Sequence, residues 1–230
     1  MDFEHVKAVF EEYLNGYDRE NDKVKLKIVH TYGVIRCSEE IGRFEQLKRF
    51  NSFEADTMDH ATYGVKVLFE EGMIRQFIEE DTWDDVIRTA IAKHSDYELT
   101  GITDERTLLH ARLIRDADKL DNCRVKLEDA METLLDLSAD EVGKYAISPK
   151  VREDAFAGKC ICSKDRRTPM DYWVSYVAYF YDLNFQETLD IVAEEQYVKR
   201  IIGRVPYTNE QTKKTMEELE RQLTEYVRRK

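Results

Sequence analysis

The stretch DERTLLHARLIRDADKLDNCRV, residues 104–125, predicts a long helix and decides the fold class more than any other part of the chain. At 100° per residue, Asp118 lies on the same line as Ala111, Ile114 and Val125, so the predicted inward stripe contains a carboxylate. Only 9 Gly and 3 Pro interrupt the 230 residues, and Glu, Lys, Leu, Arg and Ala are plentiful. The sequence therefore predicts an all-α fold, organised as a single domain over residues 1–230.

Periodicity and helix-boundary residues extend this prediction along the chain. Helices are expected at residues 2–14, from about 22 into the forties, 57–71, 82–95, 104–125 or beyond, 132–146 and from 209 onward. Gly72 is expected to end the helix before it, and Thr82 with Asp85 resembles a capping box. Residues 148–169 are predicted as the one long loop. The aromatic stretch MDYWVSYVAYFYDLNF, residues 170–185, is predicted to form core or a dimer interface.

Composition restricts the partners. The net charge of -12 and the pI near 5.0 argue against binding to nucleic acid or to an anionic membrane surface by bulk charge. The start, MDFEHVKAVFEEYL, carries acids among its apolar residues, so we expect neither a signal peptide nor a membrane span, and a cytoplasmic protein. The cysteines Cys37, Cys123, Cys160 and Cys162 match no zinc or disulfide pattern and are predicted to be free thiols, with weak metal binding by Cys160 and Cys162 as the alternative.

Three histidines fall on the predicted apolar faces of separate helices. The residues that define these faces are Leu26, Val34, Cys37 and Ile41 for His30, Gly64, Val67 and Leu68 for His60, and Trp83, Val86, Ile87, Ala90 and Ile91 for His94. Each could be a core histidine hydrogen-bonded to a carbonyl group. An inward Asp118 needs a partner because a buried carboxylate is costly alone, and that partner is a metal held with the histidines, or else Arg115 or Lys119.

The motifs around these residues resemble the HD-domain superfamily of metal-dependent phosphohydrolases. The resemblance covers about Val24 to Asn122 and rests on VKLKIVHTYGV (24–34), IGRFEQLKRFNSF (41–53), MDHATYGVKVLFEEG (58–72), IRTAIAKHSDYEL (87–99) and DADKLDN (116–122). It implies an HD-like helical bundle over about residues 20–130, with a C-terminal helical extension over about 131–230. It also implies that His30, His60, His94 and Asp118 hold a divalent metal ion, namely Mn, Ni, Zn, Fe or Mg.

The family's signature, an adjacent His-Asp pair, is absent just before Ile41, where the chain passes from HTYGVIRCSEE into IGRFEQL. Either the protein has lost this segment or the printed sequence omits it. Without the pair, His30 and Asp118 remain at one metal position and His60 and His94 at the other. Two protein ligands at each position are fewer than the three that catalytic zinc sites keep. A single site built from all four residues would require the helices to close up.

Two functions of different class follow from the resemblance. The first is a phosphohydrolase for a nucleotide or another small phosphate ester, in which a metal-bound water attacks phosphorus and Arg43 and Lys119 contact the phosphate. For both cations, an ordinary surface salt bridge is the alternative. The second is a degenerate, non-catalytic helical module that binds a phosphorylated ligand or a protein partner. A homodimer through the aromatic C-terminal region is a further expectation.

Overall fold

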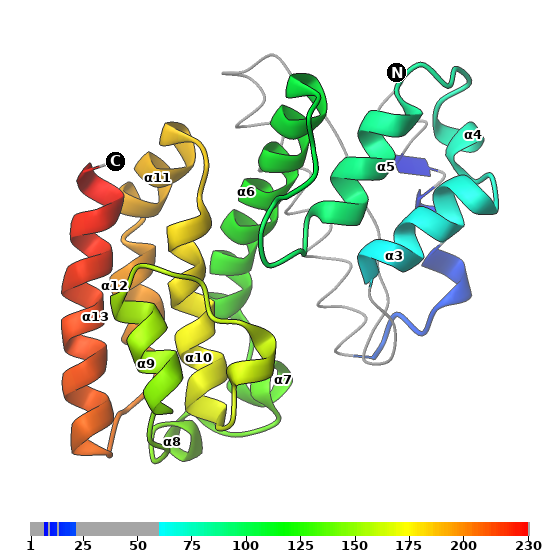
Figure 1. Ribbon diagram of the computed structural model, residues 1–230. Helices are drawn as coiled ribbons and strands as arrows, with labels where there is room; N and C mark the ends of the chain where they lie inside the picture. Colours follow the sequence, from blue (N-terminus) through cyan, green and yellow to red (C-terminus); the bar gives the residue numbers. More distant parts are fainter. Residues whose placement is uncertain (1–6, 9, 13, 22–59, 230) are drawn as a thin grey trace. The chain divides into compact units, whose positions relative to one another are not determined.

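The computed structural model describes residues 7–8, 10–12, 14–21 and 60–229, and within these ranges every regular element is helical (Figure 1). The predicted all-α fold is confirmed. The chain divides into two compact units, residues 1–118 and 119–230, which we call the N-terminal and C-terminal units. The boundary falls inside helix α6 (Glu105–Glu128). The expectation of a single domain stays a prediction.

The N-terminal unit contains short helices before α6. Residues 7–8 and 10–12 are helical, and the other elements are η1 (Leu14–Gly16), α3 (His60–Val65), the π-helix η2 (Lys66–Glu70), α4 (Ile74–Phe77) and α5 (Asp84–Lys93). Gly72 follows η2 with φ +77°, the left-handed conformation that ends helices, as predicted. The expected capping box at Thr82 is wrong, because α5 begins after Trp83 without a side-chain cap. Trp83 is 39% exposed and lies under the guanidinium of Arg106 rather than on the buried stripe.

The C-terminal unit is a bundle in which α13 lies along α9, α11 and α12 (Figure 1). Beyond the end of α6, its elements are α7 (Met131–Leu135), α8 (Ala139–Val142), α9 (Pro149–Phe156), η3 (Ser163–Asp165), α10 (Pro169–Ala178), η4 (Tyr179–Asp182), α11 (Gln186–Glu194), α12 (Tyr197–Ile202) and α13 (Glu210–Arg229). The predicted long loop at 148–169 is therefore wrong over α9. Pro149 and Pro169 each stand at the start of a helix, where the N–H group that proline lacks would have no acceptor within the helix.

The aromatic stretch 170–185 supplies the core of this unit. Trp173 and Phe180 are completely buried, together with Met170, Val177 and Leu183. Among the aromatic residues of the stretch, only Tyr172 is exposed, with 40% of its surface accessible. The prediction of core is confirmed, while the dimer interface stays a prediction.

A buried carboxylate joins the starts of α9 and α10. Asp171 is 0% exposed and accepts hydrogen bonds from the Ser148 amide at 2.8 Å and the Ser148 hydroxyl at 2.6 Å. It also accepts from the amides of Arg167 at 2.8 Å and Thr168 at 2.9 Å. The Thr168 hydroxyl accepts from the Asp171 amide in return, which completes a capping box. Asp171 thus satisfies amides at two helix ends that would otherwise be buried without acceptors.

Candidate functional site

Helices α3 and α5 pack side by side in opposite directions. An added Cβ on Gly64 would lie 3.5 Å from Cγ2 of Ile91, and in η2, which follows α3 directly, the ring of Phe69 lies 4.8 Å from the guanidinium of Arg88. Later residues of the α3 and η2 segment thus contact earlier residues of α5, so the two segments run antiparallel. His60 begins α3 and His94 follows the last residue of α5, so both backbone positions belong to the same end of the pair.

The C-terminal end of α5 is fastened to α6 by Arg115. This side chain is 2% exposed, and its Nη1 donates to the carbonyl oxygens of Lys93 at 3.2 Å, His94 at 3.0 Å and Asp96 at 2.6 Å. These carbonyls lie at a helix end, where the helix offers no donors of its own. Asp118 follows Arg115 by three residues, which is about one helical turn. The residue after α5 and the turn of α6 that leads to Asp118 are therefore held together.

The ring of His94 is fixed by its own helix. Nδ1 lies 2.7 Å from the carbonyl oxygen of Ile91, and because that oxygen only accepts, Nδ1 carries the proton of the neutral ring. Nε2 then carries the lone pair of the neutral ring, a protonation pattern that metal-bound histidines commonly show. The same bond also matches the alternative of a histidine hydrogen-bonded to a carbonyl. His94 is half-buried.

The buried acids of α6 differ from the predicted one. Asp118 is half-buried, whereas Asp116 and Asp121 are completely buried. Asp121 accepts two hydrogen bonds from Arg124, each at 2.9 Å. The burial of Asp116 and Asp121 was not predicted from the sequence, because periodicity indicates a single inward-facing stripe on this helix. In the structure the helix is covered on several sides, and its buried apolar residues are Ala111, Leu113, Ile114, Ala117, Leu120, Cys123 and Val125.

Lys119, predicted to contact phosphate, forms an ion pair in the C-terminal unit. Its Nζ lies 2.8 Å from Oδ2 of Asp182, and the two side chains are 12% and 26% exposed. The salt-bridge alternative is thus observed for this residue. Its role toward a phosphate stays a prediction.

Other predicted site residues lie beyond what the structure describes. His30 and Arg43 fall within residues 22–59, and for His60 only the backbone position is described. Among the described residues no group of three or more His, Cys, Asp and Glu side chains could hold a metal ion. Cys123, Cys160 and Cys162 form no disulfide with one another, and Cys37 lies outside the described ranges. No helix in the described part is long and apolar enough to span a membrane.

Comparison with known proteins adds no relative. No family model, no curated protein and no solved structure matches the chain. The motifs and the contacts among α3, α5 and α6 are therefore the features of the chain that bear on its function.

Proposed function

We propose that the chain is a metal-dependent phosphohydrolase of the HD type, acting on a nucleotide or another small phosphate ester. The observation that carries the proposal is the attachment of Arg115 to the carbonyl oxygen of His94, one turn before Asp118 on α6. A shared metal needs its ligands to converge from separate helices to within about 2–2.3 Å of one ion. The hydrogen bonds of Arg115 connect α5 to α6, and a fixed connection between these helices supports the proposal that ligands from both reach one ion.

The donor types of the proposed ligands support a divalent ion. His94 supplies an imidazole and Asp118 a half-buried carboxylate, and both are donor types that divalent ions take in proteins. His30 and His60 complete the proposed ligand set. When bound, such an ion lowers the pKa of a water molecule and stabilises charge on the phosphate.

The chain's own residues position the reaction. Arg115 orients the end of α5 through its three carbonyl acceptors, and the Ile91 carbonyl orients the His94 ring. Lys119 and Arg43 are the proposed phosphate contacts. The ion pair with Asp182 would hold Lys119 in one conformation, so a phosphate would compete with Asp182 for its ammonium group.

The absent His-Asp pair sets the first experiment. The intact mass of the natural protein is compared with the 27.2 kDa of this sequence. A heavier protein would show that the printed sequence omits a segment, and the pair would then be sought in that segment. An equal mass means that four ligands, His30, His60, His94 and Asp118, must serve alone.

The second experiment measures turnover. The metal-free full chain is loaded with Mn²⁺, Ni²⁺ or Zn²⁺ and assayed with p-nitrophenyl phosphate and a panel of nucleotides. We expect hydrolysis that is lost in Asp118→Ala and retained in Asp85→Asn, whose exposed carboxylate on α5 is a matched control. A protein inert with every metal and substrate would contradict the proposal and favour the non-catalytic module.

A further inference from the structure

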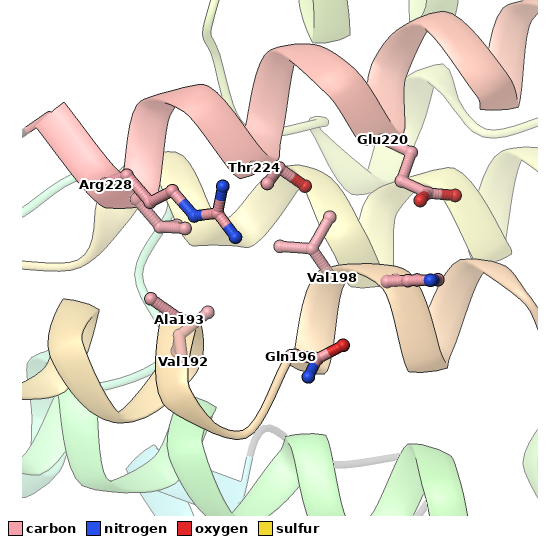
Figure 2. A pocket seen from close by; sticks show the side chains of 9 residues that line it. Val192, Ala193, Gln196, Val198, Glu220, Thr224 and Arg228 are labelled. Atoms are coloured by element: carbon pink, nitrogen blue, oxygen red, sulfur yellow. The ribbon is translucent and has the colours of Figure 1, made fainter.

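A small hollow lies in the C-terminal unit where the end of α11 and the start of α12 meet the last turns of α13 (Figure 2). Its volume is about 100 Å³. Pockets for drug-sized ligands measure about 300–1,000 Å³, so this one has room for a molecule of only a few heavy atoms. It belongs to a different unit from His94 and Asp118.

The lining of the hollow is apolar at its base. Val192, Val198 and Val227 each expose 3% of their surface or less, and Ala193 lies beside them. Short aliphatic groups are the ligands that such a base can bury favourably. The base therefore favours a ligand with a small hydrocarbon portion.

Polar groups border this base. Figure 2 shows the Arg228 guanidinium and the Thr224 hydroxyl on the α13 side of the hollow, and the Gln196 amide on the opposite side. The Arg228 side chain is exposed. Within the described part of the chain, Arg228 forms no ion pair. Gln196 holds a left-handed backbone with φ +52°, which a residue other than glycine adopts only at a cost. Guanidinium, hydroxyl and amide groups together form a set of donors suited to a carboxylate.

The opposite end of the hollow carries a negative charge. Glu220 lies on α13 eight residues before Arg228, which corresponds to about 12 Å along the helix axis. Figure 2 shows it on the far side of Val198 from Arg228. Lys199 of α12 is the second cation that lines the hollow. A carboxylate would be repelled at Glu220 and attracted by either cation, and of the two only Arg228 offers a planar fork to both carboxylate oxygens.

We propose that this hollow binds a small aliphatic carboxylate, with the carboxylate paired to Arg228 and its hydrocarbon portion on Val192, Val198 and Val227. The planar guanidinium matches both carboxylate oxygens at once. The size of the hollow favours a free short-chain acid over the terminus of a peptide.

Calorimetric titration of the full chain with isovalerate tests the proposal. We expect saturable binding that weakens at least about tenfold in Arg228→Gln, because a charge-assisted bond is lost. Arg228→Lys keeps the charge at the end of α13 but loses the fork, and should also bind more weakly. Arg221→Gln removes an exposed arginine of the same helix that does not line the hollow, and should bind like the unmodified chain.

Two further ligands complete the design. Isovaleramide has the same shape without the charge, and inorganic phosphate has charge without the hydrocarbon, so both should bind at least about tenfold more weakly than isovalerate. Circular dichroism verifies that each variant remains helical. Absence of isovalerate binding, equal binding of either comparison ligand, or unchanged affinity in a folded Arg228→Gln chain would overturn the proposal.

Discussion

Nη1 of Arg115 donates a hydrogen bond to the carbonyl oxygen of His94 over 3.0 Å, from a side chain that is almost completely buried. The bond joins two sequence positions 21 residues apart and belongs to a set of three at the end of α5. These bonds hold the end of α5, which His94 follows, against the turn of α6 that precedes Asp118.

Replacing Arg115 by Met should release the end of α5. The variant leaves three carbonyl oxygens without this donor, and we expect a loss of about 2–4 kcal/mol in the free energy of unfolding. Hydrogen exchange should speed up most at residues 91–96. Arg112→Met, an exposed arginine one turn earlier on α6, is the control and should leave exchange unchanged. Equal effects of the two substitutions would show that the buried bonds contribute nothing specific.

Asp171→Asn should destabilise the C-terminal unit. The amide that replaces one carboxylate oxygen cannot accept from the backbone groups that now donate to both oxygens, so at least one buried amide loses its acceptor. Urea unfolding should show a loss of about 2–3 kcal/mol. The exposed Asp140→Asn on α8 should change stability by less than about 0.5 kcal/mol. An unchanged midpoint for Asp171→Asn would refute the role of Asp171 in joining α9 and α10.

Gly143→Ala should be destabilising for a steric reason. A Cβ at this position would lie 2.2 Å from the carbonyl oxygen of Pro206, and backbone cannot move away as a flexible side chain can. We expect a loss of about 1–3 kcal/mol in unfolding experiments. A Cβ on Gly16 would meet no atom of the described residues within 4 Å, so Gly16→Ala serves as the comparison. Equal stability of the two variants would show that the approach of Pro206 to Gly143 is looser than described.

Acid should weaken the start of α6. The Thr107 hydroxyl and amide donate to the Asp104 carboxylate and hold its pKa below the usual value of 3.8. Because the folded-state pKa is lowered, the stabilisation is present above the unfolded-state pKa and is lost as pH falls through the folded-state value. Melting temperatures of the wild type and Asp104→Asn should therefore differ at pH 7 and converge as the pH falls below the lowered folded-state pKa of Asp104. A difference independent of pH would exclude the carboxylate as its source.

Local sequence features predicted much of the architecture. The glycine after η2, the burial of Val67 and Leu68 beside Gly64, and the burial of Trp173 follow from periodicity and from the conformation of glycine. Proline misled the prediction at residue 149, because a proline that breaks one helix can equally begin the next.

The candidate site was less accessible from sequence. Lys119 pairs with Asp182, 63 residues away, and Arg115 binds carbonyls about 20 residues away, and helical periodicity carries no information on such contacts. The prediction that Asp118 is the inward carboxylate of α6 failed for the same reason. Burial of Asp116 and Asp121 depends on which elements cover each side of α6, which its own sequence does not state.

The central claim is that His94 and Asp118 bind one metal site, and titration of the metal-free full chain with Mn²⁺ tests it most directly. We expect stoichiometric Mn²⁺ binding that weakens by more than about tenfold in both His94→Ala and Asp118→Asn. Because both residues would bind the same ion, the loss of affinity in the double variant should be smaller than the sum of the two single losses. Asp85→Asn should bind as the wild type does. A wild-type chain that binds no Mn²⁺, or variants that bind it unchanged, would contradict the account.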